Sequence, residues 1–149
     1  MTLKTLLLIP LACLTLTACG GVDPNSPLGQ RQALFKQMLK TSESLGGMLR
    51  GRVPFDETRF VEGSLKLEQL SRQPWQHFPQ VKEEDQTRAK DEVWQRQAQF
   101  QQLARSLEAS TAALVSATAQ KPLTPEALAP VMQQVEDACE ACHTEFRAF

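Results

Sequence analysis

The residues best suited to chemistry lie near the end of the chain, where two cysteines are followed directly by a histidine. Cys139 and Cys142 stand about one helical turn apart, and His143 is adjacent to the second cysteine. Two thiols at this spacing can add to the two vinyl groups on one edge of a porphyrin, and the neighbouring imidazole can then donate a nitrogen to the iron. The segment therefore predicts covalent attachment of one haem c, with His143 as the axial ligand of the iron.

Two other uses of these side chains are less favoured. A structural zinc ion needs four ligands, and after Cys19 the chain offers only His77 beyond these three residues. A redox or structural disulfide would account for both cysteines but gives His143 no role, and the strand-helix-strand context of thioredoxin-like proteins is missing. We therefore favour haem over zinc or a disulfide.

The start of the chain has the features of an export signal. Lys4 provides a positive charge, and a leucine-rich run follows that is too short to span a bilayer and ends in small residues. The segment LTAC, residues 16–19, resembles the lipobox of bacterial lipoproteins. This resemblance implies that residues 1–18 are a lipoprotein signal peptide and that Cys19 carries lipid. The alternative is an ordinary signal peptide that is cut at a nearby small residue.

The lipobox implies an exported protein that faces the periplasm and is held at the membrane by acyl chains on Cys19. Gly20 stands where an aspartate commonly retains lipoproteins in the inner membrane, so the outer membrane is favoured. Residues 19–29 comprise the lipidated cysteine and a segment rich in Gly, Pro, Asn and Ser, which is expected to be a flexible tether. The haem domain is then expected at residues 30–149.

The composition favours a single helical domain. The chain of 149 residues has 42% hydrophobic and 22% charged residues and a formal net charge of −1, so no basic surface for a nucleic acid is expected. No glycine follows Gly63, and a long segment without glycine is difficult to build from β-hairpins. The fold class is therefore expected to be all-α.

Apolar residues recur at helical spacing in four segments, the first two of which lie in the first half of the domain. The first helix is expected from about Gln30 to Arg50, and the second after Pro54 with Asp56 as its N-cap. The expected core-facing residues are Phe35, Met38, Leu39, Ser42, Leu45, Gly46 and Leu49 in the first helix, and Phe60, Leu67 and Leu70 in the second.

The third helix is expected within the glycine- and proline-free stretch between Val81 and Lys121, and the fourth begins with Thr124 as N-cap and Pro125 in the first turn. Pro130 is expected to kink the fourth helix or to separate a short first turn from it. Four amphipathic helices with short connections predict an antiparallel bundle. The expected core-facing residues are Val93, Gln97, Phe100, Ala104, Leu107, Thr111, Leu114 and Thr118 in the third helix, and Leu128, Met132, Val135, Cys139, Cys142 and Phe146 in the fourth.

Several short fragments, in their order and spacing, resemble the cytochrome c′ family of c-type cytochromes. The resemblance extends from about Arg31 to the end of the chain and implies a four-helix bundle with the haem in its core. The matching fragments are Arg31-Gln32, Pro54-Phe55-Asp56, Pro74-Trp75 with Phe78, Trp94 at the start of the third helix with Phe100, and the cysteine-histidine motif followed by Phe146 and Arg147.

The same resemblance assigns roles around the haem. Arg147 follows His143 by about one helical turn and is implied to lie beside the proximal imidazole, while Arg31 is implied to bind a haem propionate. The alternatives are a solvated cation at a helix end for Arg147 and an ordinary surface position for Arg31. The residues implied to wall the haem by packing in the core are Trp75, Trp94, Phe100, Met132 and Phe146.

The resemblance places Phe35 on the distal side of the iron. A phenyl ring has no lone pair for a metal, so the iron is expected to be five-coordinate and high-spin. Met38, one helical turn further on, is the alternative distal residue, although a methionine there can equally fill the core. An apolar distal side without hydrogen-bond donors is expected to admit NO and CO and to discriminate against O₂.

The expected function is that of a non-enzymatic cytochrome that binds NO or CO and takes part in electron transfer in the periplasm. The alternative is a low-spin electron shuttle with a methionine as distal ligand, acting with a redox partner protein that the sequence does not identify. A helical lipoprotein with an incidental CxxCH segment is a third possibility. Relatives commonly dimerise through their first two helices, so a homodimer is also considered. Ser42 and Gly46 are compatible with close approach in a dimer but could equally pack internally.

Overall fold

Four long helices form the framework of the protein. The computed structural model describes residues 21–80, 82 and 87–148. The framework helices are α1 (Pro27–Leu49), α2 (Glu57–Ser71), α4 (Gln97–Ala117) and α5 (Pro125–Phe146), and two shorter elements connect α2 to α4, namely the 3₁₀ helix η1 (Pro74–His77) and α3 (Glu92–Gln95). The predicted all-α four-helix bundle is confirmed. The predicted signal peptide and Cys19 lie outside the described residues.

Two helices begin at the caps that the sequence predicts. The Asp56 side chain accepts a hydrogen bond from the backbone N–H of Arg59 at 3.0 Å, which satisfies one of the unpaired donors at the start of α2. The Thr124 hydroxyl accepts from the backbone N–H of Ala127 at 3.3 Å, with Pro125 in the first turn of α5. Both starts are therefore fixed by local chemistry.

Helix α1 begins earlier than predicted, at Pro27 rather than near Gln30. The Ser26 hydroxyl accepts from the backbone N–H of Gly29 at 3.0 Å, and Pro27 occupies the first turn. A serine followed by proline is a helix start signal. It was missed here because the surrounding segment is rich in Gly, Pro and Asn, which is typical of a linker. The residues Pro27–Gly29 consequently belong to α1 and not to the tether.

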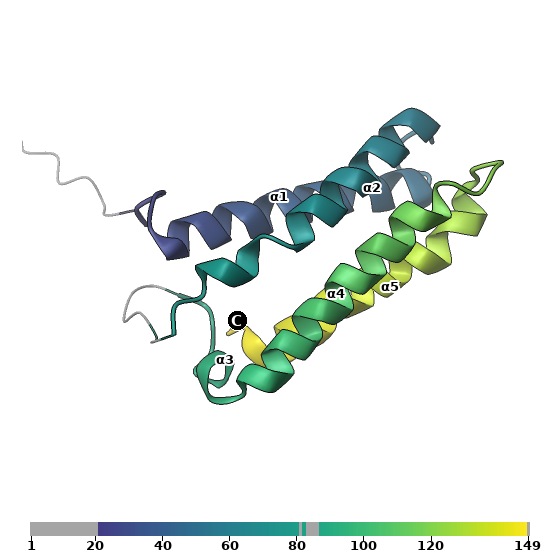
Figure 1. Ribbon diagram of the computed structural model, residues 1–149. Helices are drawn as coiled ribbons and strands as arrows, with labels where there is room; N and C mark the ends of the chain where they lie inside the picture. The colour runs from purple at the N-terminus through teal and green to yellow at the C-terminus, as the bar shows by residue number, and fades with distance from the viewer. Residues whose placement is uncertain (1–20, 81, 83–86, 149) are drawn as a thin grey trace, which may run out of the picture.

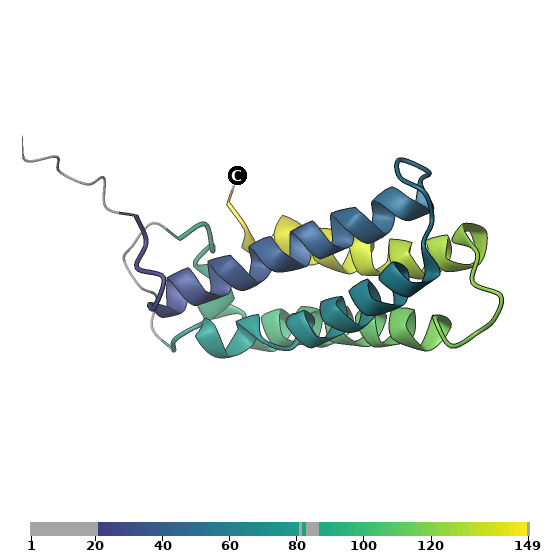
Figure 2. The same ribbon diagram turned by 90° about the horizontal axis from the view of Figure 1, so that it is seen from above.

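The four helices are arranged as two antiparallel hairpins, α1 with α2 and α4 with α5 (Figure 1). Helix α1 also contacts α5, and α2 contacts α4, which closes the bundle (Figure 2). The two hairpins diverge toward the end that carries η1, α3 and the C-terminus. That wider end is the end at which the CxxCH segment of α5 lies.

An aliphatic core fills most of the bundle. Phe60, Leu114 and Val135 are completely inaccessible to solvent, and Leu45 and Leu128 are nearly so. Burial of a side chain of this size contributes about 1.5–3 kcal/mol relative to leaving it exposed. This cluster, with its main members on all four long helices, holds the hairpins together independently of the residues at the wide end.

The prediction that Leu39 of α1 faces the core is wrong. Leu39 is 59% exposed, whereas Met38 beside it is only 6% exposed. Successive side chains on a helix are rotated by about 100°, so the residue after an inward-facing methionine falls on the solvent side unless a neighbouring helix covers it. The apolar face predicted for α1 is therefore too broad, because it includes Leu39.

Within the described part of the single chain, Gly46 does not mark a close approach of another helix backbone, and its role in a dimer stays a prediction. A Cβ atom at Gly46 would meet the guanidinium of Arg50, which folds back over its own helix and pairs with Glu136 at 3.0 Å. The close approach between α1 and α2 occurs instead at Gly63, where a Cβ would lie 2.8 Å from Leu45 Cδ2. A larger residue there would have to displace the terminal methyl of a fully buried leucine.

The predicted third helix is interrupted at Arg96, where the backbone has φ −118° and ψ 50°. The first part becomes the short α3, which carries Trp94, and the main helix α4 starts at Gln97, whose side chain is exposed rather than in the core. No glycine or proline marks the break. Arg96 Nη1 pairs with Glu145 at 2.9 Å, and the guanidinium lies 5.1 Å from the centre of the Phe146 ring, so contacts with α5 account for the changed direction.

Helix α5 runs through Pro130 as one element, so the separate first turn considered above is absent from this part of the described chain. Within residues 21–80, 82 and 87–148, no helix is both long and apolar enough to cross a membrane.

Candidate cofactor site

Helix α5 presents both motif cysteines toward the interior at the wide end of the bundle. Cys139 is partly buried against the aliphatic core, and Cys142, about one turn further, is partly buried against a second cluster that consists mainly of aromatic side chains. Both thiols are free. The pair therefore marks the boundary between the two clusters, which is where a flat apolar group attached to both sulfurs would begin.

The surroundings of the thiols keep them protonated at neutral pH. Burial, then the neighbouring Cys142 and Glu136, raises the pKa of the Cys139 thiol to about 11. Burial likewise raises the pKa of Cys142. These thiols are therefore poor sites for a metal that requires thiolates, whereas a thioether carries no charge and is compatible with an apolar environment.

His143 follows on the exposed side of α5. Partial burial of its ring, and then the charge of Arg147, lowers the pKa of the imidazole from its usual value. In the part of the chain that the structure describes, the imidazole has no hydrogen-bond partner. A neutral, unpartnered imidazole is the form that can donate a nitrogen lone pair to iron.

Arg147 is the C-cap of α5, and its backbone N–H still donates to the His143 carbonyl at 3.1 Å, so it follows His143 by one helical turn. Its place beside an iron-bound imidazole stays a prediction. Its backbone is extended (φ −113°, ψ 130°) and pairs with Ala89 in an isolated antiparallel bridge. Lys90 N donates to Phe146 O at 2.9 Å, and Ala148 N donates to Arg88 O at 2.7 Å. Pairing with the α2–α4 connection thus ends α5, although Arg147 stays close enough to affect His143.

The aromatic residues expected around the haem do gather in one place. Phe35 from α1 lies 6.0 Å from Trp75 of η1, and Trp75 lies 5.9 Å from Phe100 of α4 (ring centroids). Phe100 lies 5.4 Å from Phe146 of α5 with perpendicular ring planes. These aromatic rings thus come from four separate segments, and Cys142 of the CxxCH segment packs against the second cluster.

Phe78 is the member of this cluster to which the sequence analysis gave no role of its own. It contacts Phe35 at 6.4 Å, Trp94 at 6.5 Å and Phe100 at 4.9 Å (ring centroids). The sequence feature that could have identified Phe78 is its position three residues after Trp75 in the same loop. Phe78 joins Trp94, which is only partly buried, to the rest of the cluster.

Arg31 is buried, with 2% of its surface exposed, so the surface position considered for it is wrong. Its guanidinium donates to the backbone carbonyl of His77 at 2.9 Å and to the Thr87 hydroxyl at 3.3 Å, and it lies 4.8 Å from the centre of the Phe78 ring. Arg31 therefore fastens the connection between α2 and α4 onto α1. Its predicted contact with a propionate stays a prediction.

The two tryptophans of the chain differ in how their indole N–H groups are satisfied. Trp94 Nε1 donates to the carbonyl of Pro79 at 2.8 Å. Trp75 Nε1 is buried and has no acceptor among the described residues. A buried donor without a partner costs free energy, so its presence against the same two clusters as the thiols indicates that a group with an acceptor belongs here. The thiols, the imidazole, the aromatic walls and this donor fit a covalently attached haem.

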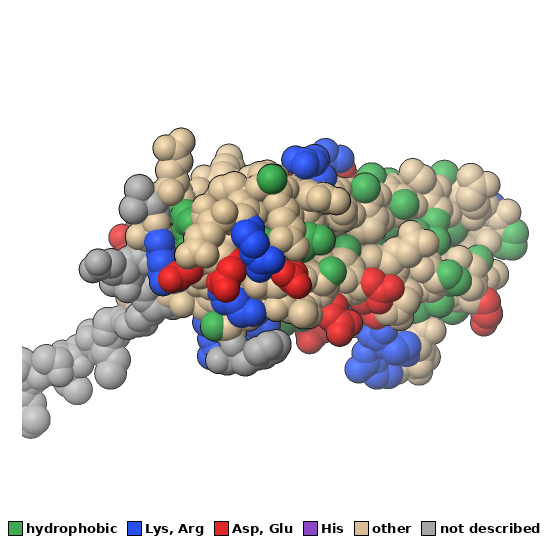
Figure 3. Space-filling model, turned by 90° about the horizontal axis from the view of Figure 1, so that it is seen from below, with side chains coloured by type: hydrophobic (Ala, Val, Ile, Leu, Met, Phe, Trp, Pro, Cys, Tyr) green, Lys and Arg blue, Asp and Glu red, His purple; other side chains and the backbone are tan. Residues whose placement is uncertain are grey.

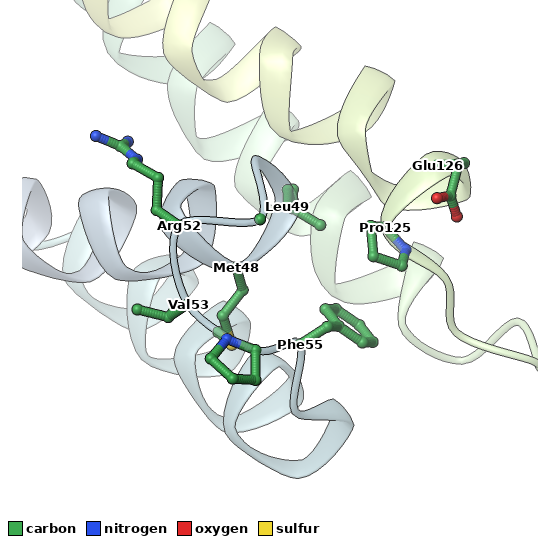
Figure 4. A pocket seen from close by; sticks show the side chains of 9 residues that line it. Met48, Leu49, Arg52, Val53, Phe55, Pro125 and Glu126 are labelled. Carbon is green, nitrogen blue, oxygen red and sulfur yellow. The ribbon is translucent and has the colours of Figure 1, made fainter.

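Two surface hollows lie away from this cluster. One, of about 450 Å³, is formed at the opposite end of the bundle by the α1–α2 loop with Phe55, Arg52 and Val53, and by Pro125 and Glu126 of α5 (Figure 4). With about 1.5 Å of rise per residue, Pro125 is about 21 Å along the helix axis from Cys139. This hollow is therefore separate from the cofactor site.

The other hollow is a groove of about 410 Å³ between α4 and α5, on the outer face of the CxxCH turn. Asp137, Glu140 and Glu145 line it, and Glu145 is paired with Arg96. Figure 3 shows the molecule from the side of α4, where acidic and basic side chains are interspersed. Among the described residues, no side chain of this groove accepts a hydrogen bond from the buried Trp75 indole.

A helical bundle with two thiols and an imidazole in this arrangement defines a c-type haem protein. The family model described as Cytochrome C′ matches residues 26–147, so the chain belongs to the cytochrome c′ family. Members of this family carry a covalently bound c-type haem, which is therefore the cofactor of this chain. The bundle expected from the family resemblance and the observed bundle agree.

Individual relatives agree with this assignment. A curated cytochrome c′ from Rhodopseudomonas palustris is 29% identical over 123 residues, which is 81% of each chain. The structure of cytochrome c prime from Shewanella frigidimarina has a TM-score of 0.79 at 23% identity and covers 87% of this chain and 100% of its own. Cytochrome c′ from Rubrivivax gelatinosus has a TM-score of 0.74 at 25% identity, covering 83% and 98%.

A third solved structure is a nitric oxide complex of a variant of cytochrome c prime from Alcaligenes xylosoxidans. Its TM-score is 0.75 at 22% identity, and the match covers 87% of this chain and 99% of that one. At this identity the similarity establishes the shared fold.

Proposed function

We propose that this protein is a gas-binding cytochrome whose haem is attached at Cys139 and Cys142 and whose iron is ligated by His143. The observation that carries this proposal is the position of the two thiols, which lie at the boundary between the aliphatic core and the aromatic cluster, next to a neutral imidazole. When bound, the haem supplies an iron centre that can change its oxidation state and coordinate a small ligand.

The distal side of the site is assigned to Phe35. Its ring is partly buried and is in contact with Trp75 and Phe78, so it belongs to the same cluster as the other walls of the site. A phenyl group offers the iron no lone pair, which leaves one coordination position for NO or CO. In support, nitric oxide and carbon monoxide complexes exist for variants of cytochrome c prime from Alcaligenes xylosoxidans.

The test uses the absorption spectrum of the reduced and oxidised holoprotein, with and without NO and CO. Five-coordinate iron should be high-spin when reduced and should bind both gases. Phe35→Ala should speed CO and NO binding, because an incoming ligand no longer has to displace the ring. Phe35→Met should tend to give a low-spin haem that excludes the gases.

An electron shuttle with a methionine ligand is the competing function, and Met38 is the residue that favours it. Met38 lies on α1 one turn beyond Phe35, and it is buried against the aliphatic core. If it only fills the core, Met38→Leu should leave the spectrum nearly unchanged. A low-spin spectrum in the unmodified protein that becomes high-spin in Met38→Leu would replace our proposal by the shuttle.

We place the protein in the periplasm, anchored to the outer membrane through lipid on Cys19. The support is the LTAC segment of residues 16–19, which is followed by glycine and by a short segment before α1 begins. The unmodified protein should partition with membranes, and Cys19→Ala should remove both lipid labelling and membrane association. Complete solubility of the unmodified protein after normal processing would contradict this anchoring.

We also propose a homodimer formed through α1 and α2. Leu39 of α1 and Leu65 of α2 are 59% and 45% exposed, which gives these two helices apolar side chains on their outer faces. Sedimentation analysis of the unmodified protein should show a dimer, and Leu39→Lys combined with Leu65→Lys should give a monomer with an unchanged spectrum. A monomeric unmodified protein at high concentration would contradict the proposal.

A further inference from the structure

The indole N–H of Trp75 is the buried donor at the cofactor site that needs explaining. The Nε1 atom is buried, and no hydrogen-bond acceptor reaches it within residues 21–80, 82 and 87–148. The other tryptophan provides the comparison, because Trp94 Nε1 is bonded to the Pro79 carbonyl at 2.8 Å. The described residues therefore satisfy one indole and offer no acceptor to the other.

Trp75 has little freedom to find an acceptor elsewhere. Its ring makes edge contacts with Phe35 on one side, at an interplanar angle of 66°, and with Phe100 on the other, at 81°. Phe100 is 3% exposed and is itself packed against Phe146. These contacts come from α1 and α4, so a rotation of the indole would have to displace side chains on two helices.

The position of Trp75 relates it to the haem. Trp75 packs against the aliphatic core, as Cys139 does, and also against the aromatic cluster, as Cys142 does. The indole and the two thiols therefore share the boundary between the clusters. A group that is joined to both sulfurs and extends along this boundary comes within reach of the indole.

The chemistry of the haem limits which acceptor this can be. The vinyl groups are consumed by the thioether bonds, and the ring nitrogens are occupied by iron, which leaves the propionate carboxylates as the hydrogen-bond acceptors of the porphyrin itself. An ionised carboxylate makes a stronger bond with an N–H donor than a neutral acceptor does. Arg31, the other candidate partner, already binds the His77 carbonyl and the Thr87 hydroxyl.

We propose that the Trp75 indole N–H donates a hydrogen bond to a haem propionate and so fixes the orientation of that carboxylate at the wide end of the bundle. This inference rests on the proposed attachment of haem at Cys139 and Cys142. The alternative acceptor is a gas molecule on the iron, because Trp75 also contacts the distal residue Phe35.

The test is resonance Raman spectroscopy of the reduced, CO-bound holoprotein. The propionate bending mode should shift in Trp75→Phe, which removes the N–H and keeps an aromatic ring. The matched control Trp94→Phe should leave this mode in place, because that indole donates to a backbone carbonyl. An unchanged propionate mode in Trp75→Phe would overturn the proposal. If the C–O stretching mode shifted while the propionate mode did not, the donor would face the gas and our assignment would also be wrong.

A second measurement does not depend on the substitution being tolerated. In the unmodified holoprotein, exchange of the indole proton for deuterium should shift the propionate mode, and the two indole N–H resonances of the CO-bound protein should both exchange slowly. Rapid exchange of the Trp75 resonance, assigned in the unmodified protein through its contacts with the Phe35 and Phe100 rings, would contradict a bond to the propionate. Failure of haem attachment would show instead as haem that separates from the unfolded polypeptide, so the two proposals fail in different ways.

Discussion

Removing the Arg31 side chain should loosen the connection that covers the cofactor site. Arg31→Ala deletes a guanidinium that donates to the His77 carbonyl at 2.9 Å and to the Thr87 hydroxyl at 3.3 Å and that lies over the Phe78 ring. Because the side chain is buried, its loss also leaves the His77 carbonyl without this donor. The α2–α4 connection would then be held mainly by its pairing with the end of α5.

The size of the effect follows from these contacts. A hydrogen bond from a charged donor contributes about 1.5–3 kcal/mol, and a cation over an aromatic ring about 0.5–2 kcal/mol. The three contacts share one side chain and are not additive, so we expect Arg31→Ala to reduce the free energy of unfolding by about 3 kcal/mol. Arg31→Lys should recover only part of it, because an ammonium group cannot span two acceptors as a guanidinium does.

Urea unfolding of the holoprotein, followed by Soret absorption and far-ultraviolet circular dichroism, measures this loss. Trypsin should also cleave after Lys82 and Arg88 more rapidly in Arg31→Ala. The control is Arg105→Ala, on the exposed face of α4, which should change stability by no more than about 0.5 kcal/mol. Equal unfolding midpoints and cleavage rates for Arg31→Ala and the unmodified protein would refute the reasoning, and full recovery in Arg31→Lys would refute the role of the guanidinium geometry.

Two further predictions concern the attachment of the haem and the packing of the bundle. Replacing Cys139 and Cys142 together with alanine should make the haem extractable by acidified acetone, whereas haem that extracts freely from the unmodified protein would exclude thioether attachment. Gly63→Ala places a Cβ 2.8 Å from buried Leu45 and should destabilise the protein by about 1–2 kcal/mol, although alanine favours helix. Gly47→Ala, whose nearest neighbouring atom lies at 4.0 Å, should instead stabilise it by about 0.5–1 kcal/mol, and urea midpoints that do not differ in this sense would contradict the packing.

The parts of the fold that the sequence predicts correctly are those set by local chemistry. Asp56 and Thr124 cap α2 and α5 as expected, because a side-chain oxygen at the N-cap needs only the N–H groups that follow it in the chain. The spacing of Cys139, Cys142 and the buried residues before them also predicts correctly which side of α5 faces the interior, because it depends only on positions along one helix. Ser26 is the exception, since its helix start lies in a segment whose composition resembles a linker.

The features that the sequence does not predict depend on contacts between distant segments. The break at Arg96 has no proline or glycine to announce it and coincides with the pairing of Arg96 to Glu145. The extended backbone of Arg147 results from pairing with Ala89. The burial of Arg31 depends on acceptors that lie more than forty residues further along the chain. In each case the contacting residue lies far away in the sequence, so it can be identified only from the three-dimensional arrangement of the helices.

These distant contacts concentrate at the wide end of the bundle, and this distribution bears on how the cofactor and the fold depend on each other. The aliphatic core joins all four long helices without any residue of the CxxCH segment other than Cys139. The aromatic cluster, in contrast, brings together Phe35, Trp75, Phe100 and Phe146 from four segments and includes a donor that the described chain does not satisfy. Contacts between haem and this cluster exist only in the folded chain, so they stabilise the folded state. We therefore expect loss of the haem to loosen the wide end first, while the aliphatic core continues to hold the helices together.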